Sequence, residues 1–179
     1  MTIICAYPDR KARVSWIGCN LGVTYGSTAH ESDPFWHRLG PWWIAQSSEP
    51  RAETVMAGMR TELAACKTIL ELTTSLRQAI RDDGFKAKDE YGAPVLGATF
   101  LIAQPGRLWE IDSAFHLTEE RGFWAIGSGR EVAFGAAHAL HPAQPKNVVS
   151  KALDAAIHHD VWSPGKPWKR ELKAEAKGK

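Results

Sequence analysis

Short apolar runs and amphipathic stretches alternate in blocks along the chain. Residues 2–7 form an apolar run typical of a buried strand, and residues 13–19 alternate as its hairpin partner would. After a passage rich in glycine, serine and threonine, another strand is predicted at 41–45. Apolar residues then recur at helical spacing over 49–64 and 67–80, so two helices are expected.

The second half of the chain repeats this order. Strands are predicted at 97–103 and 107–112, joined by a turn at 104–106, and a short apolar segment follows at 122–127. Helices are expected from about 131 to 140 and from about 145 to 159. Strands and helices in separate runs favour an antiparallel α+β protein with helices packed on its sheets.

Length and charge set broad limits. With 179 residues and 44% hydrophobic content, the chain is expected to form one globular domain with a sizeable core. A formal charge of +2 gives no global signature of nucleic-acid binding. The excess of positive charge is concentrated in residues 166–179, which we expect to form a basic tail with a weak last strand at 168–172.

Cysteine usage and hydropathy indicate the compartment. The three cysteines lack metal-type spacing, which suggests buried thiols in a reducing environment. No signal peptide or membrane span is evident, so a cytoplasmic protein is expected. His138 and His141 have helical spacing, but Pro142 ends that helix and no acidic partner is near, so neither a metal nor a cofactor is expected. Most of the eight tryptophans are expected in the core or in subunit contacts.

The start of the chain offers a candidate nucleophile. Met1 precedes Thr2, a small residue after which the initiator is usually removed. Thr2 would then carry a hydroxyl and a free α-amine, whose reference pKa of about 7.7–8.0 allows it to act as a general base. Because very many proteins begin with these two residues, the meaning of Thr2 depends on the rest of the chain.

Two later motifs give Thr2 its context. A Gly127-Ser128-Gly129 turn opens the third helical region, and the fourth ends in the run Asp160-Val161-Trp162-Ser163 followed by Pro-Gly. With the Thr2 start, these motifs resemble proteasome β-subunits and HslV-type peptidases, which are N-terminal-nucleophile hydrolases. The resemblance covers nearly the whole chain, which looks like a divergent bacterial or phage member.

The resemblance implies both a fold and a site. Residues 1–165 would form a four-layer α-β-β-α sandwich, with two stacked antiparallel sheets flanked by helices. Thr2 would be the nucleophile at the mouth of the sandwich. Ser128 would hydrogen-bond near its α-amine, while Asp160 and Ser163 would orient that amine.

The chain departs from the family pattern at the aspartate that precedes the second-strand turn. Asn20 is the best match, with Thr24 and Gly26 at the following Thr-x-Gly, and Cys19 is the other candidate. Asn20 is therefore a degenerate member of the candidate site.

A second departure affects the family's lysine, which lowers the proton affinity of the nucleophile. The sequence has no lysine between Lys11 and Lys67, and the position falls at Phe35 or Trp36, with His37 beside it. Loss of both members of a buried ion pair indicates a coordinated replacement, because deleting one member alone is costly. The oxyanion glycine also has no evident match, since residues 47–49 are Ser-Ser-Glu.

Three hypotheses follow. The first is a threonine-type endopeptidase that assembles into a ring-shaped homo-oligomer, acts on peptides and, as the resemblance implies, works with a ring-shaped ATPase. The second is a non-catalytic relative that keeps the fold as a structural or interaction subunit. The third keeps the chemistry on another amide, with His37 in place of the lysine.

Overall fold

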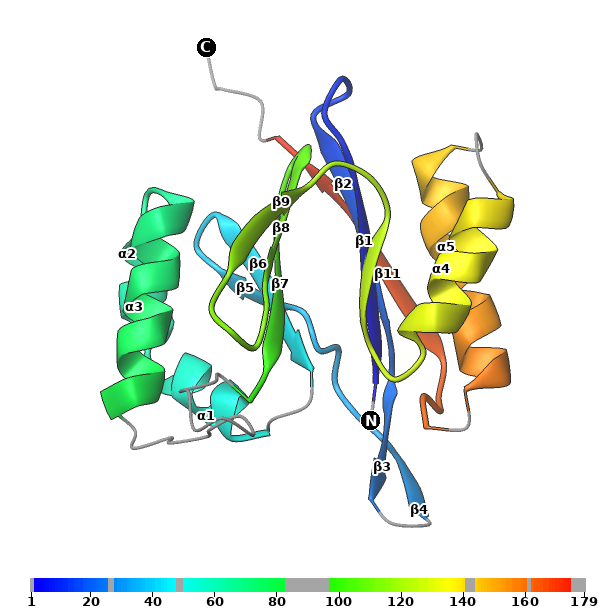
Figure 1. The fold of residues 1–179 in the computed structure, drawn as a ribbon, viewed down its shortest axis with the longest axis horizontal. Coiled ribbons are helices and arrows are strands. Elements are labelled where there is room, and N and C mark those ends of the chain that lie inside the picture. The colour runs from blue at the N-terminus through cyan, green and yellow to red at the C-terminus, as the bar shows by residue number, and fades with distance from the viewer. Residues whose placement is uncertain are drawn as a thin grey trace.

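The computed structural model describes residues 2–25, 28–47, 50–82, 97–140, 144–160 and 162–174. Its elements stack as helices, sheet, sheet and helices (Figure 1). All strand neighbours in the two large sheets are antiparallel. The predicted four-layer α-β-β-α sandwich is confirmed.

The first sheet carries the N-terminus at the lower end of the view in Figure 1. Its strand order is β10-β1-β2-β11, and α4 and α5 cover its outer face. The bounds are β1 (Ile3–Asp9), β2 (Val14–Asn20), β10 (Trp124–Gly127), β11 (Pro167–Lys173), α4 (Arg130–Ala139) and α5 (Pro145–His159).

The second sheet has the order β5-β6-β7-β8-β9, with three helices on its outer face. A separate two-stranded sheet, β3 and β4, projects below the sandwich at the end where the N-terminus lies (Figure 1). The bounds are β5 (His37–Leu39), β6 (Trp42–Ser47), β7 (Thr99–Gln104), β8 (Arg107–Ile111), β9 (Leu117–Glu120), α1 (Pro50–Gly58), α2 (Arg60–Ala65), α3 (Ile69–Asp82), β3 (Gly22–Tyr25) and β4 (Thr28–Glu31).

Most predicted elements are present, and the differences have local causes. The helix expected over 49–64 is two helices, because Met59 leaves the helical conformation with φ −103° and ψ 21° directly after Gly58. The glycine-rich passage before residue 32 contains β3 and β4, which the hydrophobic pattern did not indicate. β9 was also missed, since none of its four residues is buried.

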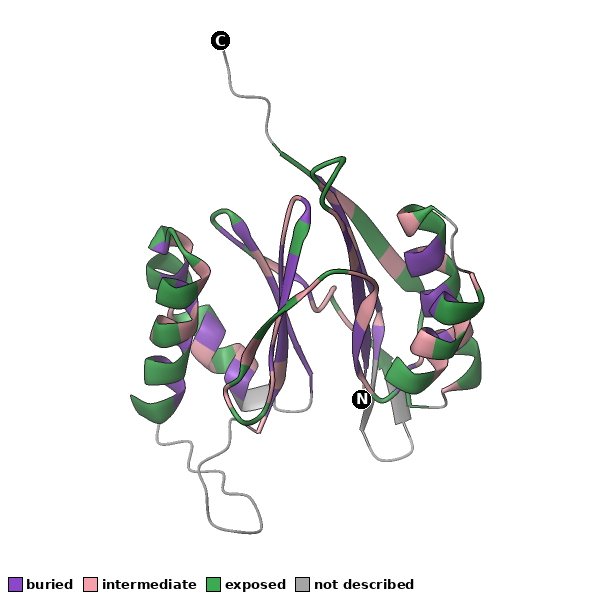
Figure 2. Cartoon of the chain, turned by 45° about the horizontal axis from the view of Figure 1, so that its top comes forward, coloured by how far each residue is buried: buried purple, intermediate pink, exposed green. Residues whose placement is uncertain are grey.

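Buried residues fall mainly on the strands and on parts of the flanking helices (purple in Figure 2), and they form three clusters between the four layers. One cluster lies between α1–α3 and the second sheet, one between the sheets, and one between the first sheet and α4–α5. Trp36, Trp42 and Trp109 are core residues as expected, whereas Trp162 is 45% exposed. The three cysteines are free thiols and all are buried.

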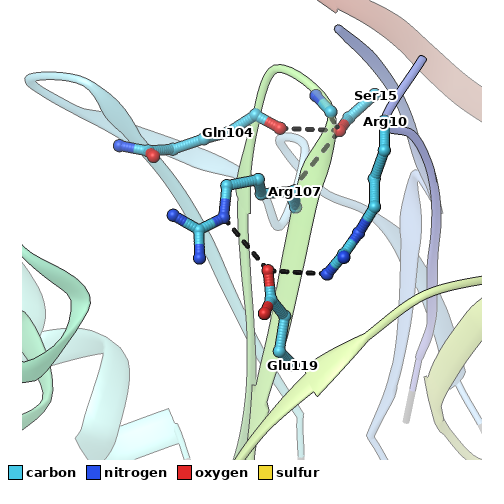
Figure 3. A network of polar contacts seen from close by, with 6 residues as sticks. Arg10, Ser15, Gln104, Arg107 and Glu119 are labelled. Atoms are coloured by element: carbon cyan, nitrogen blue, oxygen red, sulfur yellow. Dashed lines mark hydrogen bonds and ion pairs between the residues drawn. The ribbon is translucent and has the colours of Figure 1, made fainter.

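A polar contact fastens the two sheets at the end that carries the β1–β2 hairpin (Figure 3). The buried hydroxyl of Ser15 in β2 donates to the carbonyl of Gln104, 2.6 Å away, and accepts the N–H of Gly106 at 3.0 Å. Beside it, the carboxylate of Glu119 pairs with Arg10 and Arg107 at 2.8 and 3.0 Å. The turn between β7 and β8 is therefore bonded directly to the other sheet.

We expect Ser15→Ala to lower the free energy of unfolding by about 1–3 kcal/mol, because it leaves the buried N–H of Gly106 and the partly buried carbonyl of Gln104 without the Ser15 hydroxyl. Chemical denaturation followed by tryptophan fluorescence measures the change. Thr74→Ala, at an exposed position of α3, is the control and should change stability by less than about 0.5 kcal/mol. Equal effects of the two substitutions would contradict this role for Ser15.

Candidate active site

The residues around Thr2 come from three parts of the chain that meet at one end of the first sheet. Thr2 lies directly before β1 and is 6% exposed. Its hydroxyl donates to the side-chain oxygen of Asn20 at 2.6 Å, and its carbonyl accepts the N–H of Ser128 at 2.9 Å. The structure thus brings Thr2 together with Asn20 and Ser128, and the contact with Ser128 runs through the Thr2 carbonyl.

Asn20 is fully buried at the end of β2, and its amide has all its hydrogen bonds filled. The side-chain oxygen accepts from the Thr2 hydroxyl and from the N–H of Ile3, the latter at 2.9 Å. The side-chain nitrogen donates to the carbonyls of Gly22 and Pro164, at 2.7 and 2.8 Å. The orientation of the amide is therefore determined by its surroundings, since a backbone N–H requires an acceptor and two carbonyls require donors.

A carboxylate could not replace this amide without loss. An ionised aspartate accepts hydrogen bonds only, so it would face the carbonyls of Gly22 and Pro164 without a proton to share. Asn20 therefore suits this particular environment, in which backbone acceptors occupy two of its four contacts.

Ser128, Asp160 and Ser163 form a second polar cluster beside Thr2. One carboxylate oxygen of Asp160 lies 2.6 Å from the hydroxyl of Ser128 and 2.6 Å from that of Ser163. The two hydroxyl oxygens are 3.1 Å apart, but each has one proton, so when both donate to Asp160 they do not bond each other. The other carboxylate oxygen accepts the N–H of Trp162 at 3.1 Å.

These contacts set the charge of Asp160. Burial raises the pKa of its carboxyl, but hydrogen bonds from Ser128, Ser163 and the Trp162 amide outweigh this, so the pKa lies below its usual value. Asp160 is therefore ionised near neutral pH and places a negative charge close to the start of β1.

Two glycines allow the turns to approach the strand ends. Gly127 has φ +100°, and a Cβ there would collide with the carbonyl of Thr2. Gly165 has φ +99°, and a Cβ there would lie 2.7 Å from the carbonyl oxygen of Leu21. Only glycine combines this backbone conformation with this close contact, which is why the Ser128 and Pro164 turns can reach Thr2 and Asn20.

Of the two candidates for the aspartate position, Asn20 contacts Thr2. The thiol of Cys19 instead belongs to the apolar cluster between the sheets, and burial raises its pKa to about 12. Of Thr24 only the backbone, in β3, is described, and Gly26 lies outside the described residues.

An aromatic side chain occupies the region expected for the lysine. Trp36 is 4% exposed, packs between the sheets, and donates its indole N–H to the carbonyl of Gly18 at 3.1 Å. Phe35 packs partly buried against the same cluster. Neutral, apolar groups therefore fill this space.

His37 is not brought together with Thr2 by any described hydrogen bond. It pairs across the strands with Ile44, whose side chain faces the helices, and its ring lies 3.3 Å from the carboxylate of Glu53 in α1. The hydrogen bond from His37 lowers the pKa of Glu53. His37 thus contacts the outer helical layer rather than the Thr2 hydroxyl.

The remaining sequence expectations concern the oxyanion position and metals. Ser47 is buried at the end of β6, and residues 48 and 49 lie outside the described residues. Within the described ranges, no cluster of histidine, cysteine, aspartate or glutamate could hold a metal ion, and His141 lies outside them. None of the described helices is long and apolar enough to cross a membrane.

Sequence reasoning missed two parts of the site, the carbonyls of Gly22 and Pro164. They act through the backbone, so no side chain in the sequence marks them. The Pro-Gly dipeptide after Ser163 was the available signal, because it predicts a tight turn whose carbonyl can point inward.

Comparison with solved structures relates this geometry to known folds. BPH from Thiobacillus denitrificans matches with a TM-score of 0.78 and 17% identity over 97% of this chain and 98% of that chain. The same protein in complex with Epoxomicin matches with a TM-score of 0.77 and 16% identity, covering 98% of this chain and 100% of the other. HslV from Trypanosoma brucei matches with a TM-score of 0.67 and 20% identity over 97% of this chain and 100% of that chain.

No protein-family model and no curated protein sequence matches this chain. At the identities of the structural matches, the likeness establishes the fold. It confirms the expectation of a proteasome/HslV-like N-terminal-nucleophile hydrolase fold.

We expect Asn20→Asp to destabilise the protein by about 3–5 kcal/mol at neutral pH, as for a buried charge left without a partner. The loss should be smaller at acidic pH, where the protonated carboxyl can donate to one carbonyl. Urea unfolding at several pH values measures both effects. The matched control is Asn147→Asp, at an exposed position in the first turn of α5, where a negative charge is tolerated. A neutral effect of Asn20→Asp would contradict the hydrogen-bond assignment.

We also expect the Asp160 cluster to stabilise the fold in a pH-dependent way. Because the pKa of Asp160 is lowered on folding, its contribution is present above the unfolded value of about 3.9 and is lost as pH falls through the folded value. The stability difference between wild type and Asp160→Asn should therefore shrink in acid. Thermal unfolding across pH measures it, with Asp154→Asn as a control for losing an exposed carboxyl of α5. A difference that grows in acid would refute this assignment.

Proposed function

We propose that this chain, which has the proteasome/HslV-like N-terminal-nucleophile hydrolase fold, is a non-catalytic subunit that uses the fold for structure or interaction. The observation that carries the proposal is the contact between the Thr2 hydroxyl and the amide of Asn20. This contact makes the hydroxyl part of a buried hydrogen-bond network rather than a group prepared for attack.

The network opposes activation of Thr2. A hydroxyl becomes a good nucleophile when a base takes its proton, and an amide oxygen is a hydrogen-bond acceptor but not a useful base at neutral pH. The N–H of Ile3 also donates to the side-chain oxygen of Asn20, which identifies this atom as the acceptor. The Thr2 hydroxyl must therefore direct its proton toward that oxygen. Deprotonating Thr2 would place an alkoxide beside the amide oxygen, which is unfavourable.

The surroundings also lack the cation that would favour deprotonation. Within the described residues, no lysine or arginine is hydrogen-bonded to Thr2 or Asn20. Phe35 and Trp36, the two candidates for the lysine position in the sequence, pack in the apolar cluster between the sheets. Replacing both partners of a buried ion pair with neutral packed groups is often energetically neutral, whereas losing one partner costs several kcal/mol. This supports a coordinated replacement of the family's aspartate and lysine that preserves the stability of the fold and removes the means of activating Thr2.

One observation favours the second candidate, an active threonine-type endopeptidase. The cluster of Ser128, Asp160 and Ser163 lies beside Thr2, whose carbonyl accepts the N–H of Ser128, and by family resemblance it would orient the α-amine of a processed Thr2. A related fold, that of T. denitrificans BPH, has been solved with Epoxomicin. Activity would then require the amine to take the Thr2 proton without help from a lysine. The described ion pair of His37 is with Glu53, so this contact does not let His37 take the place of that lysine.

Self-association is part of both candidates. By family resemblance, we propose a cytoplasmic homo-oligomer, with a ring and a ring-shaped ATPase as the arrangement that such relatives suggest. In the non-catalytic form, such a subunit would contribute surface and symmetry to the assembly, and no peptide would be hydrolysed.

The decisive test combines intact-mass measurement with Epoxomicin labelling of purified protein. We expect no mass increase on Thr2, either because Met1 is retained and blocks the amine or because the hydroxyl is not activated. T. denitrificans BPH serves as the positive control for the reagent. An adduct on Thr2, mapped by tandem mass spectrometry, would overturn the non-catalytic assignment.

A structural role for Thr2 predicts its own mutational pattern. Thr2→Ala should lower the free energy of unfolding by about 1–2 kcal/mol, because the buried oxygen of Asn20 loses a donor. Thr2→Ser keeps the hydroxyl and should retain most of the stability. Neither substitution should change peptide hydrolysis from background, measured with unstructured casein. Hydrolysis that Thr2→Ala abolishes would show that the enzyme is active.

A further inference from the structure

The last strand, β11, ends the first sheet with an open side. Among the described strands it pairs with β2 alone. Just before β11, the carbonyl of Lys166 accepts the N–H of Leu21 at 2.8 Å. In an antiparallel pair, only every second residue directs its N–H and C=O toward the neighbouring strand, so this bond shows which residues of β11 face β2. The backbone groups that point away from β2 therefore belong to Pro167, Lys169, Glu171 and Lys173. Proline has no N–H, so the open edge offers its first donor at Lys169.

The open edge is positively charged. β11 carries three basic side chains and one acidic side chain, and Glu171 already pairs with Lys173 at 3.1 Å. Within the described residues, Arg170 forms no ion pair, and its guanidinium stacks on Trp43 of the other sheet at 4.6 Å from the ring centroid. On the helical side, the ammonium of Lys169 is held by the hydroxyl of Ser150 at 2.8 Å.

Hollows with apolar walls and basic rims lie on both faces of this strand. One, of about 580 Å³, lies between β11 and the β5–β6 hairpin and is lined by Trp43, Leu172 and Arg170 among others. Another, of about 180 Å³, lies between β11 and α5, where Trp16 and Val149 form walls beside the lysines. A strand added to this edge would direct alternate side chains into the two hollows, because side chains alternate across a sheet.

We propose that the free edge of β11 binds an extended acidic segment of a partner protein by strand addition. Main-chain hydrogen bonds to Lys169, Glu171 and Lys173 would give affinity, and carboxylates on the added strand would meet the basic rims. Apolar side chains between those carboxylates would enter the hollows. The proposed contacts on Lys169, Glu171 and Lys173 involve none of the residues hydrogen-bonded to Thr2 and do not depend on whether Thr2 is active.

Charge argues against a second copy as the occupant. Antiparallel self-pairing centred on Glu171 would set Lys169 opposite Lys173 and Glu171 opposite its own copy. Pairing centred on Arg170 would set that arginine opposite its own copy, and the two Lys169–Glu171 pairs that it creates would compete with the Glu171–Lys173 pair already present. Like charges directly opposite each other destabilise a sheet. The basic side chains that keep two copies apart attract an acidic strand.

The test uses an acetylated, amidated seven-residue peptide that alternates glutamate and valine, titrated into ¹⁵N-labelled full-length protein. We expect the largest amide shifts at Lys169, Glu171 and Lys173, and weaker binding as salt is raised toward about 1 M, where charges are screened within about 3 Å. The same peptide with lysine in place of glutamate should not bind. Equal binding of both peptides, or shifts confined to other elements, would overturn the proposal.

Two variants separate backbone pairing from charge. Glu171→Pro removes an outward N–H without removing a bond to β2, and it should abolish binding. The double substitution Lys169→Glu with Lys173→Glu should weaken binding about tenfold or more, and it keeps the test valid if the proline variant does not fold. Lys151→Glu, a single charge reversal at an exposed position of α5, is the control and should bind as wild type does. Unchanged binding in the double variant refutes the site. Wild-type self-association that Glu171→Pro abolishes would also refute it, because a second copy would then occupy the edge.

Discussion

The amide of Asn20 is the contact on which the arrangement of the site depends. It joins the start of β1, the beginning of β3 and the turn between α5 and β11, which are far apart in the sequence. The four hydrogen bonds are made by an oxygen that accepts twice and a nitrogen that donates twice, a combination that a carboxylate cannot supply. The chemistry available to Thr2 and the geometry of the turns around it are therefore set by one neutral side chain.

The site divides into two halves with different properties. On the side of Ser128, Asp160 and Ser163, an ionised carboxylate is held by hydroxyl and amide donors close to the chain start. On the side of Asn20 and Trp36, the groups are neutral and their polar atoms are already bonded. Orientation of a charged amine and activation of a hydroxyl are separate tasks, so one half can persist after the other has changed. Most residues of the three apolar clusters between the layers lie outside both halves, although Trp36 belongs to the cluster between the sheets.

The site and the proposed docking edge meet at one strand. Asn20 holds the carbonyl of Pro164, the Gly165 turn follows, and β11 begins two residues later. The same turn that completes the hydrogen bonds of Asn20 thus positions the strand whose outer side is open. In a subunit with a structural role, Asn20 would therefore help to fix the placement of an interaction surface.

The sequence by itself determined the class of fold and most strands and helices, and it named Asn20, Ser128, Asp160 and Ser163 as candidates to lie near Thr2. Apolar periodicity is a local property, and the Gly127-Ser128-Gly129 and Asp160–Ser163 motifs mark tight turns that only certain residues can form. β9 was not predicted because none of its four residues is buried, so they create no hydrophobic pattern. The choice of Asn20 over Cys19, the outward position of His37 and the open edge of β11 were decided by the tertiary structure. Backbone carbonyls decided the role of Asn20, contact with α1 decided the position of His37, and the order of the described strands left β11 at the edge of its sheet. None of these can be read from the side chains that flank each position in the sequence.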